Sequence, residues 1–181
     1  MRALLPLVAL VVAACASSGG APTGRATETV RIDGVGTLNM AGASATASVT
    51  SLAYPIDQAW TALRTVYDSL AIPVTTQDPA THTIANDGFK IRNRLGKTAL
   101  SRYLECGNTQ MGPSADSYEV YLSVTTHLKP ADAGSTSVES TVEATARPVQ
   151  FAQAPSRCTS KGELETRIAT QLRTALAQPK R

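Results

Sequence analysis

The sequence has few aromatic residues and no apolar run long enough to cross a membrane. Aromatic residues make up 4% of the 181 residues, with a single Trp, so we expect a core of Val, Leu, Ile and Ala. The longest apolar stretch, residues 3–14, is about 12 residues long, whereas a membrane-spanning helix needs about 20. The net charge is only +3, which argues against nucleic acid as a partner.

Recognisable catalytic motifs are absent as well. No serine lies in a G-x-S-x-G turn. The segment "LGKTAL" ends like a phosphate-binding loop, but Ile91 stands where such a loop needs its first glycine. His82 and His127 lie far apart in the chain and have no acidic neighbour at a fixed spacing. We therefore predict that the protein is not an enzyme and has neither a metal nor a cofactor.

The N-terminus has the order of an export signal. Arg2 precedes the apolar residues 3–14, and Cys15 follows them; this length suits the apolar region of a signal peptide. The sequence "VAAC" that ends at Cys15 resembles the bacterial lipobox. That resemblance implies a signal peptide of residues 1–14, a diacylglyceryl group on the Cys15 thiol and an acylated new N-terminus.

The same resemblance implies a location. Acyl chains hold a domain on a bilayer because each buried CH₂ contributes about 0.8 kcal/mol. An Asp after the cysteine commonly favours the inner membrane of two-membrane bacteria, and here that position is Ala16. We expect the protein on the periplasmic face of the outer membrane, with the membrane as a partner through the lipid anchor.

Composition then divides the rest of the chain. Residues 15–26 contain the lipidated Cys15 and a Gly- and Ser-rich segment, which predicts a flexible tether that reaches roughly 20 Å. Residues 27–181 are assigned to one domain.

Two cysteines remain after Cys15, and an even pair in an exported domain indicates a disulfide between Cys106 and Cys158. The alternative is a zinc site completed by His82 and His127, although none of these residues has the spacing of a zinc motif.

Hydrophobic periodicity predicts the main elements. In residues 118–128, Val120, Leu122 and Val124 share one parity, and residues 135–146 alternate in the same way, which predicts an antiparallel hairpin with one solvated face. Two strands are expected within residues 27–53 around a glycine-rich turn. Two shorter strands are expected near residues 82–95, followed by an irregular loop.

Two helices complete the prediction. Apolar residues at helical spacing from residue 56 to 70 predict a helix that ends before Pro73, with Trp60 as a core residue rather than part of a binding site. The second helix carries an apolar stripe of Leu164, Ile168 and Leu172, and "SKGE" predicts a capping box between Ser160 and Glu163.

These elements predict an α+β domain in which an antiparallel sheet packs against two helices. The order of elements over about residues 44–178 resembles the helix-grip domains, including those of the BamC-type lipoproteins of the outer-membrane β-barrel assembly machine. The resemblance concerns element order only, so it assigns no functional residue.

Residues 85–104 are strongly basic. The segment contains one acidic residue, Asp87, and five basic residues: Lys90, Arg92, Arg94, Lys97 and Arg102. The first three alternate, which would place them on one face of a strand. They are either solvated charges that protect an edge strand or a docking face for an anionic surface: lipid headgroups, a glycan or an acidic envelope protein.

Two functions follow as hypotheses. The first is a membrane-anchored envelope lipoprotein that acts as a non-enzymatic scaffold or accessory subunit through the exposed face of the sheet. The alternative is a carrier or sensor that binds an apolar ligand between sheet and helices, which requires a pocket of about 300 Å³ or more.

Overall fold

The computed structural model describes residues 28–32, 36–40, 47–150 and 152–178. The chain divides into two units, residues 1–41 and 42–181, with the boundary inside the range assigned above to one domain. In the first unit, β1 (Glu28–Ile32) and β2 (Gly36–Met40) pair as an antiparallel hairpin. The predicted signal peptide, Cys15 and tether lie outside the described residues.

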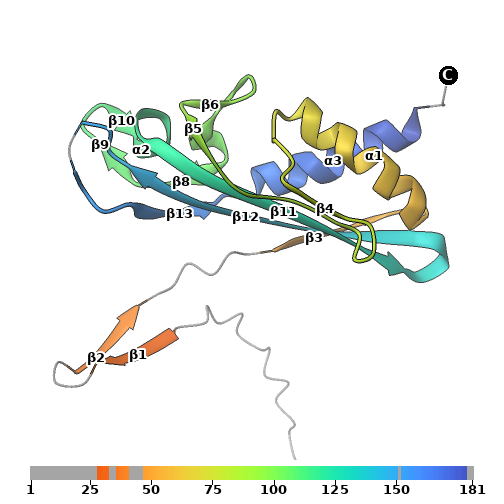
Figure 1. Cartoon of the computed structure of the whole chain (residues 1–181), viewed down its shortest axis with the longest axis horizontal. Helices are drawn as coiled ribbons and strands as arrows, with labels where there is room; N and C mark the ends of the chain where they lie inside the picture. The colour runs from red at the N-terminus through yellow and green to blue at the C-terminus, as the bar shows by residue number, and fades with distance from the viewer. Residues whose placement is uncertain (1–27, 33–35, 41–46, 151, 179–181) are drawn as a thin grey trace, which may run out of the picture. The chain divides into compact units, whose positions relative to one another are not determined.

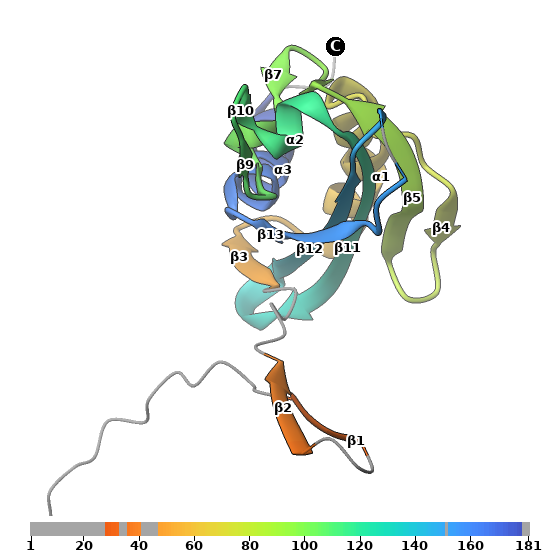
Figure 2. The ribbon, with the colours of Figure 1, turned by 90° about the vertical axis from the view of Figure 1, so that its left-hand side faces the viewer.

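The second unit is built on a seven-stranded antiparallel sheet (Figure 1). Its strand order is β4–β5–β11–β12–β13–β8, and β3 also pairs with β12. Seen end-on, the sheet curves around the helices (Figure 2). Its strands are β3 (Ser48–Leu52), β4 (Thr76–Asp78), β5 (Thr83–Arg92), β8 (Leu104–Glu105), β11 (Glu119–Ala131), β12 (Ser135–Arg147) and β13 (Ser156–Ser160).

The long hairpin is confirmed. β11 and β12 pair along their whole length and are joined by a short 3₁₀ turn, η2 (Asp132–Gly134). Along β11, the residues of the predicted inward parity are buried, while Tyr121 on the other parity is 49% exposed. One face of the sheet therefore forms the core and the other meets solvent.

Two helices, α1 (Ile56–Ser69) and α3 (Glu163–Ala177), pack on the inner face of the sheet, which confirms the predicted α+β class (Figure 1). Leu63 and Tyr67 of α1 are fully buried. Trp60 is half-buried and packs against the core, with its ring edge-on to His82 at 5.6 Å. This position agrees with the core role expected for Trp60.

The predicted capping box is wrong. Ser160 ends β13, and the cap of α3 is Gly162, whose φ of 78° lies in the left-handed region that favours glycine. The Ser160 hydroxyl donates to Glu165 Oε1 at 2.6 Å and accepts from the Gly162 N–H at 3.2 Å. The serine therefore orders the turn before the helix, with a glutamate two positions beyond the one expected.

The middle of the chain differs most from expectation. One strand, β5, covers most of residues 82–95, and residues 27–53 contain three strands instead of two. The region expected to be an irregular loop is a series of short elements. These are β6 (Arg94–Leu95), β7 (Thr98–Ala99), η1 (Leu100–Arg102), β8, β9 (Asn108–Thr109), β10 (Gly112–Pro113) and α2 (Ser114–Ser117).

Candidate docking surface

A row of three charged side chains crosses the solvent face of the sheet where β11 begins. The strand register places Arg92 of β5 and Arg147 of β12 directly opposite Glu119, one on each side. Val120, the next residue along β11, is fully buried. Because neighbouring residues of a strand point to opposite faces, the row of Glu119 faces solvent.

A second row lies beside the first on the same face. Lys90, Tyr121, Thr145 and Arg157 are register partners across β5, β11, β12 and β13. The four basic residues of the two rows come from three strands and are all exposed. We call them the cationic face: Lys90, Arg92, Arg147 and Arg157.

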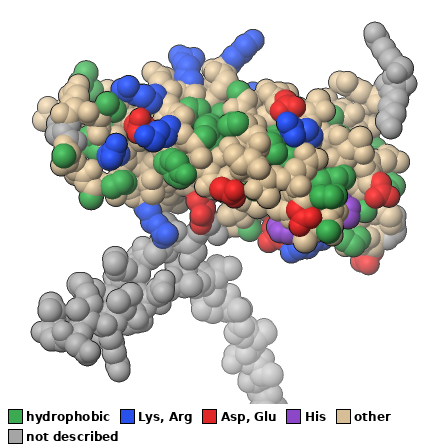
Figure 3. Space-filling model, viewed as in Figure 1, with side chains coloured by type: hydrophobic (Ala, Val, Ile, Leu, Met, Phe, Trp, Pro, Cys, Tyr) green, Lys and Arg blue, Asp and Glu red, His purple; other side chains and the backbone are tan. Residues whose placement is uncertain are grey.

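The two rows of the cationic face contain four basic residues and one acidic residue, Glu119. Glu119 Oε1 lies 3.5 Å from Lys90 Nζ and 3.9 Å from Arg147 Nη2. Arg92 and Arg157 form no ion pair with any residue that the structure describes. Lys and Arg side chains are numerous at the end of the second unit that holds β9 and β10, on the helix side as well as at the sheet (Figure 3). A concentration of one sign of charge attracts ions of the other.

Tyr121 lies across the strand beside it because Gly88 has no side chain. A Cβ built on Gly88 would stand 2.2 Å from Cε1 of Tyr121, far inside contact distance. Gly88 also has a φ of +147°, a conformation that residues with side chains rarely adopt. The glycine thus lets the aromatic ring of Tyr121 lie over β5, next to Lys90 in the strand.

The structure separates the five basic residues that the sequence grouped together. Asn93, with a φ of 66°, interrupts the strand between Arg92 and Arg94. Arg94 and Lys97 belong to the β6–β7 hairpin, which lies on the helix side of the sheet (Figure 1). Arg102 lines a hollow beside α3. Only Lys90 and Arg92 therefore share the solvent face of the sheet.

Arg147 and Arg157 were missed by the sequence analysis. They lie outside the basic segment, and each is a single charge in a stretch that looks like an ordinary strand or loop. Only the pairing of β5, β11, β12 and β13 brings them to Lys90 and Arg92.

Two open hollows adjoin the cationic face. One, of about 400 Å³, is lined by Arg92, Tyr118 and the turns at residues 109–111 and 148–150. The other, of about 600 Å³, is lined by Glu119, Arg147 and residues 148–150 and 152–154. A third, of about 330 Å³, lies between α3 and the η1 region. None of these three lies between the main sheet and the helices, where the carrier hypothesis needs its pocket.

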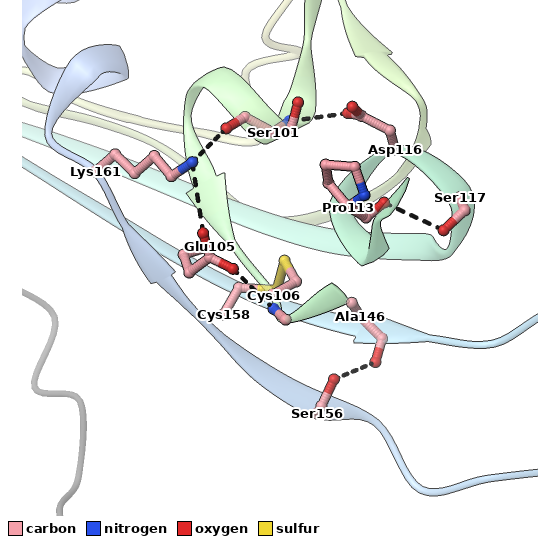
Figure 4. The surroundings of a disulfide bond; sticks show 11 residues. Ser101, Glu105, Cys106, Pro113, Asp116, Ser117, Ala146, Ser156, Cys158 and Lys161 are labelled. Atoms are coloured by element: carbon pink, nitrogen blue, oxygen red, sulfur yellow. Dashed lines mark hydrogen bonds and ion pairs between the residues drawn. A yellow bond between two sulfur atoms is a disulfide. The ribbon is translucent and has the colours of Figure 1, made fainter. Parts of the chain in front are cut away.

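The disulfide lies on the same edge of the sheet as Arg157. Cys106, which follows β8, is bonded to Cys158 of β13 (Figure 4). Lys161 adds a second link, since its Nζ donates to the Ser101 carbonyl at 2.7 Å and lies 3.6 Å from Glu105 Oε2. The cysteines bind each other and so are not ligands of the alternative zinc site.

The histidines do not assemble a metal centre among the residues that the structure describes, which contain no cluster of three or more His, Cys, Asp or Glu side chains. His127 bonds to Thr83 Oγ1 and lies opposite Glu139 on β12. A hydrogen bond from Lys129 lowers the pKa of Glu139, and one from Thr81 lowers the pKa of Asp78. This corner holds one exposed ion pair, Lys129–Glu139, beside the hydrogen bonds of Asp78, Thr81, Thr83 and His127.

Comparison with known proteins gives no family assignment. No protein-family model matches the chain, and no curated protein matches it significantly. Within the described residues, no helix is both long and apolar enough to cross a membrane.

Proposed function

We propose that the protein is a membrane-anchored envelope lipoprotein that acts as a non-enzymatic scaffold or accessory subunit. Cys15 would hold it on the periplasmic side of the outer membrane, and the cationic face would bind an anionic partner. The observation that carries the proposal is the gathering of Lys90, Arg92, Arg147 and Arg157 on one solvated end of the sheet.

The arrangement suits recognition. Side chains on paired strands keep a fixed spacing, and strands hold a binding constellation more precisely than loops do. Arginine and tyrosine are enriched at the centres of protein interfaces, and Tyr121 lies within the cationic face at 49% exposure. Arg92 and Arg157, which have no ion-pair partner within the described part of the chain, remain free to bind carboxylates or phosphates bidentately.

We expect the triple variant Lys90→Ser, Arg92→Ser and Arg157→Ser to recover less partner from solubilised envelopes than the wild type. The matched control is Arg94→Ser, Lys97→Ser and Arg102→Ser, which removes the same charge from the helix side and the η1 region. Both variants should keep their melting temperature, because exposed charges usually change stability by under about 0.5 kcal/mol each. Wild-type recovery should fall as salt rises, since the screening length at 0.15 M is about 8 Å.

Equal losses in the two variants would mean that net charge, and not the cationic face, attracts the partner. Undiminished recovery by the Lys90, Arg92 and Arg157 variant at low and high salt would contradict the docking role. These residues would then be the solvated charges of the other interpretation.

A further inference from the structure

Two exposed apolar side chains lie at the same end of the sheet as the cationic face. Met111 is 95% exposed and Val149 is 52% exposed. They come from separate turns, one between β9 and β10 and one after β12, yet both line the hollow of about 400 Å³ that Arg92 also lines. This end of the sheet therefore combines exposed apolar and cationic side chains around one hollow.

The turn that carries Met111 is fixed by its own hydrogen bonds. The Met111 N–H donates to Thr109 Oγ1 at 3.1 Å, and the Thr109 hydroxyl donates to the Gly112 carbonyl at 3.0 Å. On the other side of the hollow, Val149 follows Pro148, which is buried. Met111 therefore projects from a hydrogen-bonded turn, and Val149 projects from a segment whose preceding residue is buried.

The combination selects among anionic partners. A glycan would use the arginines but offers little apolar surface to Met111, and an acidic protein would need an apolar patch of its own beside its carboxylates. A bilayer uses both groups, because apolar side chains enter the boundary between headgroups and acyl chains while Lys and Arg bind anionic headgroups. The flexible side chain of methionine adapts well to this fluid boundary between headgroups and acyl chains.

We infer that this end of the domain docks on an anionic bilayer surface, with Met111 and Val149 inserted at the interface and Arg92 and Arg147 against the headgroups. Arg147 lines the second hollow, which shares residues 148–150 with the first, so each arginine lines a hollow that Val149 also lines. The inference rests on the proposed function, since the lipid anchor would keep the domain beside a membrane.

The test uses the full acylated chain reconstituted in phosphatidylcholine vesicles with and without phosphatidylglycerol. A polarity-sensitive dye is attached at Met111→Cys, and in a control at Ala131→Cys, an exposed position at the opposite end of β11. We expect the emission of the dye at position 111 to shift to the blue on vesicles with phosphatidylglycerol, whereas the dye at position 131 reports water. Arg92→Ser and Arg147→Ser should each lower the equilibrium constant for moving the dye at position 111 from water into the bilayer interface about fivefold.

Each outcome decides the inference. A dye at position 111 that reports water on vesicle-bound chain overturns bilayer docking and leaves an acidic protein or glycan as partner, with the anchored scaffold intact. A chain that does not remain with the vesicles overturns the anchor and the docking together. If Arg94→Ser and Lys97→Ser reduced the insertion of the dye at position 111 equally, bilayer docking would also be overturned, because those residues lie on the helix side.

Discussion

Replacing Cys106 and Cys158 by serine is expected to lower the free energy of unfolding by about 4 kcal/mol. The bond joins residues 52 positions apart, and closing a loop of that length restricts the unfolded chain by about that amount in the chain-entropy model. Urea unfolding of the wild type and the double variant, under non-reducing conditions, measures the difference.

The wild type in reductant is the matched control for the cysteine variant, and it should reach the same lower stability. The lost link would also loosen β13, which holds Arg157 in the cationic face. A double variant that unfolds at the wild-type urea concentration would contradict a structural role for the bond. Free thiols at both positions in the folded, unreduced protein would contradict the bond itself.

Tyr67→Phe is expected to make stability less sensitive to alkaline pH. The Tyr67 hydroxyl is buried under the sheet, where it donates to Thr126 Oγ1 at 2.9 Å, and Thr126 continues to Ser140 at 3.0 Å. Burial raises the pKa of Tyr67 well above its usual value near 10. The unfolded chain therefore loses this proton first as pH rises, and the wild type should lose about 1.4 kcal/mol per pH unit above pH 10 from this group.

Below pH 10, where Tyr67 is protonated in both the folded and the unfolded chain, the wild type should be the more stable of the two proteins. There Tyr67→Phe should be less stable by about 1 kcal/mol, because it lacks the hydrogen bond to Thr126. The difference should shrink to nothing about one pH unit above 10. Tyr121→Phe, which removes a hydroxyl from the solvated face, is the control and should change neither region. Parallel stability curves for the wild type and Tyr67→Phe from pH 9 to 12 would contradict a neutral, buried Tyr67.

The sequence predicted those parts of the fold that depend on local periodicity. Alternation along β11 and β12 and the helical stripes of α1 and α3 each bury one face, so the burial pattern can be read from the chain itself. The predicted cap of α3 was wrong because two glutamates, Glu163 and Glu165, follow Ser160 closely in the sequence. Which of them bonds to Ser160 depends on where β13 ends.

The docking surface could be predicted only in part, because it is assembled by contacts between residues distant in sequence. Lys90 and Arg92 were identified from their alternation, but their neighbours Arg147 and Arg157 are selected by the register of four strands. Arg94 was expected on the same face, and the left-handed conformation of Asn93 directs the chain away instead. The short elements between β5 and β11 have too few residues for a periodic pattern to develop.

The most direct test of the central claim is the intact mass of the protein recovered from the outer-membrane fraction of the bacterial envelope. An anchored lipoprotein predicts a chain that begins at Cys15, with the added mass of a diacylglyceryl group and an N-terminal acyl chain. A chain that still begins at Met1, or one whose Cys15 thiol is free, would contradict the account.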